Sequence, residues 1–124
     1  MFVSTLLRNR SLHHRFLSTK AVKHVVMFGL RADADKQGIQ AALLSLPASI
    51  PQIQTHELGV DLQLPAGQRH PAGPNRSLSW TVTFANTKDY LTYDTHPDHQ
   101  HVVSLIKEGL VPGTRAAIQY EIEG

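Results

Sequence analysis

The residues best suited to chemistry gather in one short stretch, Asp89–His101, with the sequence Asp-Tyr-Leu-Thr-Tyr-Asp-Thr-His-Pro-Asp-His-Gln-His. It holds two of the chain's three tyrosines and three of its eight histidines. A neutral histidine can act as a general base, and a tyrosine can donate a proton or stabilise an oxyanion. Tyr93 and His99 lie on either side of Pro97, close enough in sequence to share a pocket. The stretch therefore predicts a site for proton transfer around these two residues.

Pro97 divides the stretch into two predicted helical segments. Proline is disfavoured inside a helix but suits its first position, so one segment is expected to end near Asp94 and the next to begin at Pro97. His99 then lies in the first turn of the second segment, where unpaired N–H groups and the helix dipole favour a neutral imidazole. Asp98 acts in the opposite direction, so the sequence leaves the net change of the His99 pKa open.

His99 is also the polar member of an apolar stripe. The spacing i, i+3, i+4, i+7 places one set of residues on a core-facing side of the helix: His99, Val102, Val103, Ile106 and Leu110. The other side carries Gln100, His101, Ser104 and Lys107, and His101 is expected to be solvated. Two interpretations follow: His99 is a base in a pocket with Tyr93, or it is a buried histidine bonded to a backbone carbonyl while Tyr93 packs as a core aromatic.

Composition excludes several functional classes. The 124 residues suit one domain, and no run of eighteen apolar residues predicts a membrane span. Without cysteine, the chain has no disulfides, thiolate nucleophiles or zinc–thiolate sites. Four basic residues and no acid fall in residues 1–20, which leaves eight basic against ten acidic residues in the rest of the chain. Such a mildly acidic body does not favour nucleic-acid binding.

The first 20 residues differ from the remainder. They are rich in Arg, Ser and Leu, lack acids, and lack the continuous apolar core of a secretory signal, which is typical of a mitochondrial transit peptide. This predicts a location in the mitochondrial matrix, with processing near Leu17/Ser18. A disordered, weakly basic tail on a cytoplasmic protein is the alternative. Residues 21–124 are expected to form the folded domain.

Hydrophobic periodicity predicts four strands and two helical regions. The strands are expected at Val22–Leu30, Gln52–Leu64, Ser77–Ala85 and Thr114–Ile122. The first helix is expected at Lys36–Leu46, capped within Asp33–Asp35 and closed by Pro47 and Pro51. The second helical region follows a cap at Asn86 or Thr87 and ends at Gly109. Gly59 indicates a bulge or a close approach, and Pro65–Arg76 must be a long loop.

The order strand, helix, strand, strand, helix, strand predicts an α+β, ferredoxin-like β-α-β-β-α-β fold. Both helical regions would cover one face of the sheet, and the first strand is apolar on both faces. An uncovered apolar sheet face would expose more contiguous apolar surface than soluble monomers usually do. We therefore expect a homodimer in which two sheets pack across a two-fold axis as an α/β barrel. A monomer with a polar, solvated second face is the alternative.

Several segments resemble the stress-responsive dimeric α/β-barrel family, abbreviated Dabb. They are Val22-Lys-His-Val-Val, Ile50-Pro with Gly59 in the next strand, Trp80-Thr-Val-Thr-Phe, and Tyr93-Asp-Thr-His-Pro-Asp-His, within Val22–Glu123. One plant polyketide cyclase of this family uses a Tyr–His pair in an interior pocket for a cofactor-free aldol condensation. The resemblance implies Tyr93 and His99 as the catalytic pair. It further implies substrate contacts from His24, His96, Leu78 and Trp80, although that cyclase has a histidine at the position of Leu78.

These observations leave four functional hypotheses. The first is a catalytically silent stress-response homodimer that binds a small organic molecule. The second is a cofactor-independent cyclase or lyase acting on a polyketide-like or small carbonyl compound, with His99 as general base and Tyr93 as proton donor. The third is a metal site using His96 and His99; Pro97 between them and the lack of a carboxylate ligand argue against it. The fourth is a monooxygenase of the antibiotic-biosynthesis type; the His-Pro-x-His segment argues for the Dabb family instead. Neither a cofactor nor a metal is expected.

Overall fold

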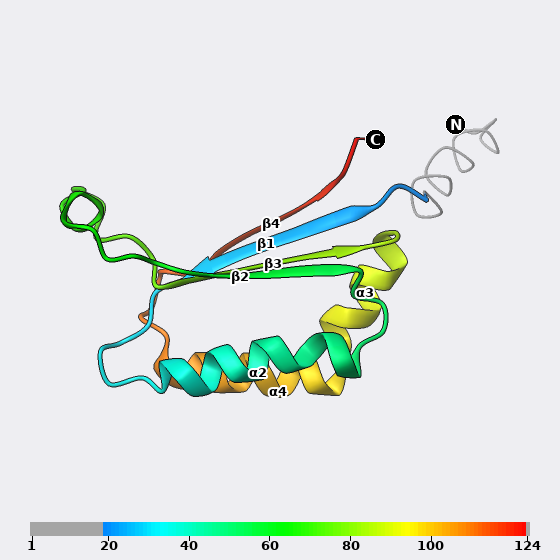
Figure 1. Cartoon of the computed structure of the whole chain (residues 1–124), viewed down its shortest axis with the longest axis horizontal. Helices are drawn as coiled ribbons and strands as arrows, with labels where there is room; N and C mark the ends of the chain where they lie inside the picture. Colours follow the sequence, from blue (N-terminus) through cyan, green and yellow to red (C-terminus); the bar gives the residue numbers. More distant parts are fainter. Residues whose placement is uncertain (1–18, 124) are drawn as a thin grey trace.

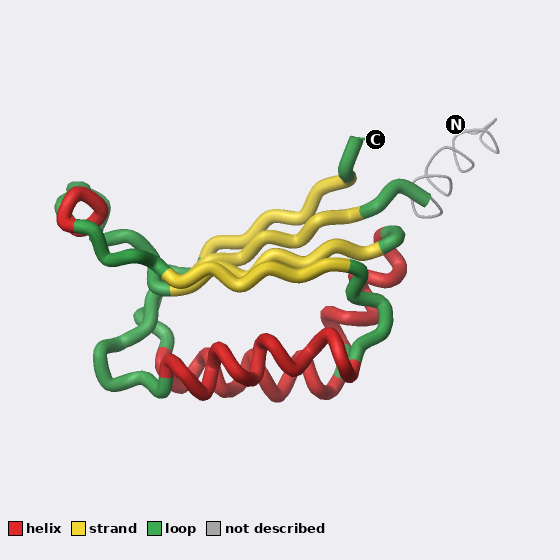
Figure 2. The backbone as a smooth tube through the Cα atoms, in the orientation of Figure 1, coloured by secondary structure: helices red, strands yellow, loops and turns green. Residues whose placement is uncertain are grey.

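The computed structural model describes residues 19–123, and the predicted transit peptide lies outside them except for its last two residues. A four-stranded antiparallel sheet with the order β2-β3-β1-β4 forms one layer, and helices cover one of its faces (Figures 1 and 2). In chain order the elements are β1 (Val22–Phe28), α2 (Lys36–Ser49), β2 (Thr55–Val60), the 3-10 turn η1 (Pro65–Gln68), β3 (Leu78–Phe84), α3 (Thr87–Thr95), α4 (Pro97–Gly109) and β4 (Ala116–Glu121). This confirms the predicted ferredoxin-like α+β fold.

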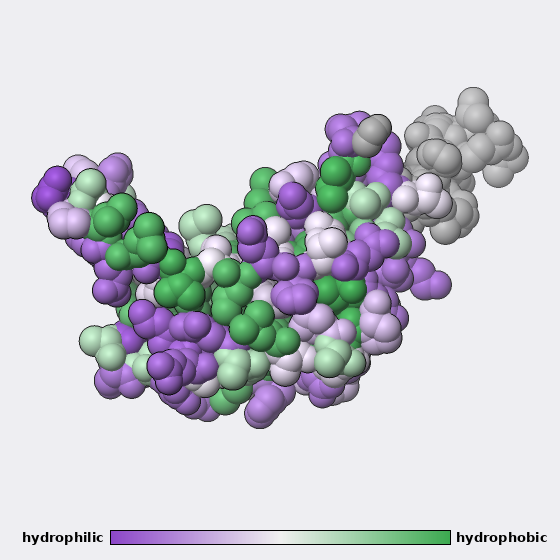
Figure 3. Space-filling model, viewed as in Figure 1, coloured by the Kyte–Doolittle hydropathy of each residue, from purple (hydrophilic) through white to green (hydrophobic). Residues whose placement is uncertain are grey.

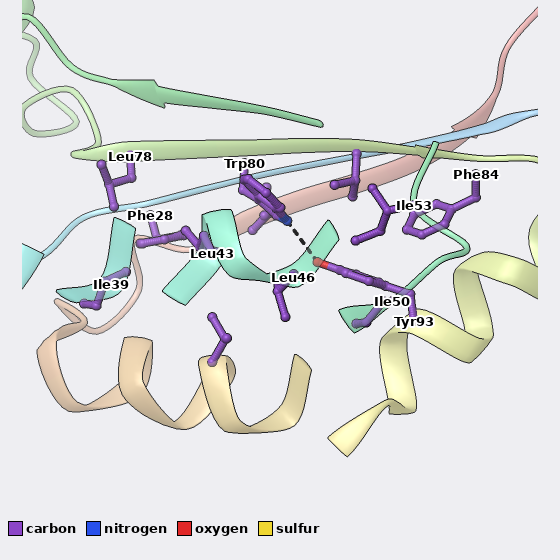
Figure 4. Close-up of a cluster of buried hydrophobic side chains, with 13 residues drawn as sticks. Phe28, Ile39, Leu43, Leu46, Ile50, Ile53, Leu78, Trp80, Phe84 and Tyr93 are labelled. Carbon is purple, nitrogen blue, oxygen red and sulfur yellow. Dashed lines mark hydrogen bonds between the residues drawn. The ribbon is translucent and has the colours of Figure 1, made fainter. Parts of the chain in front are cut away.

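The face of the sheet toward the helices carries the core. Alternate residues of β3 are buried, as their period of two predicts: Leu78, Trp80, Val82 and Phe84. β1 pairs with β3 along its whole length and buries Val22, His24, Val26 and Phe28 on the same face. The helices add Ile39, Leu43 and Leu46 from α2, Tyr93 from α3 and Val102 from α4 (Figure 4).

Capping residues fix where the helices begin. The Asp35 carboxylate accepts the Gly38 N–H at the start of α2, and the Asn86 side chain accepts the Asp89 N–H at the start of α3. Pro97 is the first residue of α4, as predicted. The break between α3 and α4 is therefore only one residue long.

The prediction that the first helix ends at Leu46 is wrong, and of the two prolines expected to close it only Pro51 lies at its end. α2 continues through Pro47 to Ser49, although a proline inside a helix removes one backbone hydrogen bond and crowds the carbonyl of the preceding turn. The helix ends at Ile50, whose N–H donates to the Leu46 carbonyl at 2.9 Å, directly before Pro51. Of the two predictions for Gly59, the close approach is observed, because a Cβ there would lie 2.4 Å from Ser79 Oγ.

None of the helices within residues 19–123 covers the opposite face of the sheet, which we call the outer face (Figure 1). Its β1 and β4 half is apolar, with Met27, Ile118 and Tyr120 exposed beside Val25. Its β2 and β3 half is polar, with Thr55, Glu57, Ser79, Thr81 and Thr83. The outer face is thus neither fully apolar nor fully polar.

The loop Pro65–Arg76 extends from one end of the sheet as an arm that points away from the helices (Figure 1). Leu62 and Leu64 lead into it with 80% and 58% of their surface exposed, and hydrophobic surface is visible at its base (Figure 3). Asp61 accepts hydrogen bonds from the Gln63 N–H and the Asn75 side chain, which ties the two ends of the arm together. No helix within residues 19–123 is long and apolar enough to cross a membrane.

Candidate functional site

A cavity of about 320 Å³ lies between the inner face of the sheet and the helices α3 and α4. Its lining comes from six parts of the fold: His24, Val26 and Phe28 of β1; Leu43 of α2; Trp80 of β3; Tyr93 and Asp94 of α3; His99, Gln100, Val102, Val103, Ile106 and Lys107 of α4; and Leu110 and Arg115 before β4. All five residues of the predicted α4 stripe line it. Gln100 and Lys107, which were expected on the other side, line it as well, whereas His101 is exposed as predicted.

The break between α3 and α4 positions the His99 ring. Carbonyls in the last turn of a helix lack partners within that helix, and the Asp94 carbonyl instead accepts from His99 Nδ1 at 3.0 Å and Gln100 Nε2 at 2.6 Å. A carbonyl oxygen can only accept, so Nδ1 carries the proton. In neutral His99 the lone pair is therefore on Nε2, where it can accept a proton.

The environment keeps His99 neutral. Burial is the main cause that lowers its pKa, and electrostatic interactions with Arg115 and His96 lower it further. The hydrogen bond to the Asp94 carbonyl and the Asp94 carboxylate act in the opposite direction but do not outweigh burial. The structure thus gives the direction of the shift that the sequence left open.

Tyr93 is a protonated donor next to this base. Its side chain is buried, and its ring centroid lies 4.2 Å from that of His99. Trp80 Nε1–H donates to the Tyr93 hydroxyl oxygen at 3.0 Å, which leaves the hydroxyl proton available for another acceptor (Figure 4). Burial raises the pKa of Tyr93 despite this bond, so the phenol stays protonated at neutral pH.

His24 is the second neutral imidazole of the cavity. Burial lowers its pKa to about 4, with smaller lowering contributions from His99 and Arg115. The Gln119 amide on β4 donates to His24 Nδ1 at 2.8 Å, which places the remaining proton of the neutral ring on Nε2. The His24 ring lies 5.3 Å from that of Tyr90 and 6.2 Å from that of Tyr93.

The structure brings together four of the six residues expected at the site: His24, Trp80, Tyr93 and His99. Leu78 is instead a core residue that does not line the cavity. His96 also lies outside the lining and caps α4, with its Nδ1 accepting the Asp98 N–H at 3.1 Å.

Sequence reasoning missed Asp94, Arg115 and Gln119 as members of the site. Asp94 and Arg115 line the cavity, and Gln119 holds the His24 ring. Local patterns could not reveal the last two, because their position depends on the pairing of β4 with β1. Within residues 19–123, no group of three or more His, Cys, Asp or Glu side chains could hold a metal ion.

The family model described as "Stress responsive A/B Barrel Domain" matches residues 22–122. The chain belongs to this family. No curated protein matches the chain. This Dabb chain is similar to a dimeric ferredoxin-like protein of unknown function from Thermobifida fusca, with 24% identity over 85% of this chain and 93% of the other and a TM-score of 0.69.

Two further solved structures share the Dabb fold. A dimeric ferredoxin-like protein of unknown function from Bacteroides fragilis is 28% identical over 82% of this chain and 96% of the other, with a TM-score of 0.60. A hydroxynitrile lyase from Passiflora edulis is 20% identical over 86% of this chain and 96% of the other, with a TM-score of 0.69. The similarity to the lyase shows the fold alone.

Proposed function

We propose that this Dabb protein is a homodimer that binds a small organic molecule in the cavity between its sheet and helices. The observation that carries this proposal is the meeting of His24, Tyr93 and His99, all uncharged, in a cavity of about 320 Å³ whose other walls are mostly apolar. Pockets for small molecules combine such apolar walls with a few convergent polar groups, and this volume falls within their usual range.

A second candidate function, cofactor-independent cyclase or lyase chemistry, is favoured by the proton positions at the site. Nε2 of His99 is left as an acceptor, and the hydroxyl of Tyr93 is left as a donor. On a small or polyketide-like carbonyl compound, His99 would remove a proton from the carbon next to the carbonyl. The electron pair would move to the carbonyl oxygen, and Tyr93 would stabilise that oxygen by donating its proton or a hydrogen bond.

The test is a thermal-shift screen against small aromatic and polyketide-like carbonyl compounds. A ligand at a hundred times its dissociation constant stabilises the folded state by about 2.7 kcal/mol. We expect stabilisation of the wild type and of His101→Ala, whose exposed ring lies on the other side of α4, and little or none in His99→Ala. Turnover of any hit should fall about 10²- to 10⁴-fold in His99→Ala.

A purely structural His99 would give a different pattern. His99→Ala would then lower the melting temperature strongly, and no compound would stabilise the wild type. Binding that is identical in the wild type and His99→Ala, with no turnover, would support a binding protein and remove His99 from the chemistry.

The homodimer and the mitochondrial location are also part of the proposal. The Thermobifida fusca and Bacteroides fragilis relatives are described as dimeric, and the apolar half of the outer face offers a surface for a second copy. The acid-free segment 1–20 supports import into the matrix. A fluorescent protein fused after residue 20 should reach mitochondria, and should stay in the cytosol when Arg8, Arg10 and Arg15 are replaced by Gln.

A further inference from the structure

Arg115 places an unpaired positive charge on the wall of the cavity. It directly precedes β4 and lines the cavity from the open edge of the sheet. Within residues 19–123 its guanidinium takes part in no salt bridge or hydrogen bond. Arg31 pairs with Asp33 and Arg76 with the Thr114 carbonyl, whereas Arg69, in the exposed arm, also has no such partner within residues 19–123 but does not line the cavity. Arg115 is therefore free to bind something that enters the cavity.

The charge of Arg115 reaches the groups that could do chemistry. Burial is the main cause of the lowered pKa of both His24 and His99, and Arg115 lowers both further. With the imidazoles neutral, Lys107 and Arg115 face only one carboxylate, that of Asp94, around the cavity. The cavity thus has a net positive lining although residues 21–124 have more acidic than basic residues.

The backbone positions that carry the two imidazoles and the two cationic side chains are separated along the cavity. Ala116 pairs with Met27, so the next residue, Arg115, lies beside Phe28, four residues or about 13 Å along β1 from His24. On α4, Lys107 lies eight residues or about 12 Å from His99. Apolar Val26, Val103 and Ile106 line the interval. The cavity therefore suits an elongated molecule with different groups at its two ends.

We propose that the ligand is a carbonyl compound with an apolar middle and a terminal carboxylate, which Arg115 binds. This rests on the proposed binding of a small molecule in the same cavity. The planar guanidinium suits a carboxylate because it can donate two parallel hydrogen bonds, and a charge-assisted pair is stronger than a neutral one. Lys107 supplies a second positive charge at this end, and the carbonyl group is directed to Tyr93 and His99.

The experiment compares acids with their neutral counterparts. The probes are ω-benzoyl alkanoic acids with two to five methylene groups and the matching primary amides, which have the same shape without the charge. Isothermal titration calorimetry on the whole chain is expected to show about ten- to a hundredfold tighter binding of the best acid than of its amide. Arg115→Gln should remove most of the preference for the acid and leave binding of the amide unchanged, and Arg115→Lys should keep more of the preference than Arg115→Gln.

Two variants serve as controls. Arg69→Gln removes an exposed arginine in the projecting arm and should keep the full preference for the acid. Val103→Phe fills the cavity, and it should abolish binding of both members of each pair while its unfolding curve stays cooperative.

Each result bears on a defined step. The carboxylate inference would be overturned if the wild type bound acid and amide equally, or if Arg115→Gln weakened both equally. Binding in the cavity would still stand if Val103→Phe blocked both compounds. Failure of every probe to bind would overturn both the inference and the proposed function. An Arg115→Gln variant that loses the dimer would assign this arginine to the subunit interface and would also overturn the inference.

Discussion

At the scale of single residues, three uncharged side chains of the site, His24, Tyr93 and His99, each have one hydrogen bond that determines which donor or acceptor is left over. The Asp94 carbonyl holds the proton of His99 on Nδ1, the Trp80 indole occupies a lone pair of Tyr93, and the Gln119 amide occupies Nδ1 of His24. Each group thereby directs its remaining donor or acceptor elsewhere. A buried histidine or tyrosine with a purely structural role needs only one hydrogen-bond partner. Here each side chain keeps a second donor or acceptor that can bind a molecule in the cavity.

The low pKa of His24 predicts a loss of stability in acid. Because burial lowers its pKa to about 4 in the folded protein, the unfolded chain binds the proton more readily between pH 6.5 and 4. The contribution of His24 to the free energy of unfolding is fully present above pH 6.5 and falls by about 3 kcal/mol as the pH drops toward 4. Urea unfolding at pH 7 and pH 4.5 should show most of this loss in the wild type.

The control for this prediction replaces the titrating ring. His24→Gln should lose clearly less stability between the two pH values, whereas His101→Gln, at an exposed position, should follow the wild type. Equal losses in His24→Gln and the wild type would assign the acid sensitivity to other groups.

At the scale of elements, the α3–α4 break shows what a local pattern can predict and what it cannot. Proline chemistry predicts that α4 begins at Pro97, and the i, i+3, i+4 spacing predicts its core-facing stripe. The i, i+3, i+4 spacing identifies the centre of the buried face of α4 but not the width of the cavity next to that face. Gln100 and Lys107 flank that face and still reach the cavity, because it is wider than the stripe.

The cap of α4 yields a prediction at the same scale. His96 Nδ1 accepts the Asp98 N–H at 3.1 Å, which satisfies one of the donors that a helix start leaves unpaired. His96→Ala should therefore cost about 1 kcal/mol of unfolding free energy, measured by urea unfolding at pH 8, and His96→Asn should restore most of it because asparagine is a good cap. Equal losses in both variants would show that His96 stabilises the chain in some other way.

At the scale of the whole molecule, the order of the elements was predictable and the composition of the site was not. Alternation in β3 and the apolar β1 fix two strands, and the element order then gives the ferredoxin-like sheet. The contact of Gln119 with His24 joins residues 95 positions apart, and Arg115 reaches the cavity only because β4 lies beside β1. Such neighbours follow from register, which no short pattern in the sequence encodes.

The same pairing of β1 with β4 gathers the apolar part of the outer face. Val25 lies opposite Ile118, and Lys23 lies opposite Tyr120, with Met27 at the end of the row. Soluble monomers rarely expose a contiguous apolar patch of this kind to water. In a two-fold symmetric dimer the same patch on each copy packs against the other, so both are buried. The apolar half of the outer face is therefore where the two copies are expected to meet.

Ile118→Lys tests this arrangement. Ile118 is 59% exposed on the outer face, and a two-fold interface would bring two introduced charges close together in an apolar contact. Sedimentation over a range of concentrations should find the wild type at twice 13.7 kDa and should find Ile118→Lys dissociated at concentrations where the wild type is dimeric. Leu44→Lys is the matched control, because Leu44 is 49% exposed on α2, and α2 lies on the side of the sheet opposite the outer face (Figure 1). A monomeric wild type, or equal dissociation of both variants, would rule out an interface through this half of the outer face.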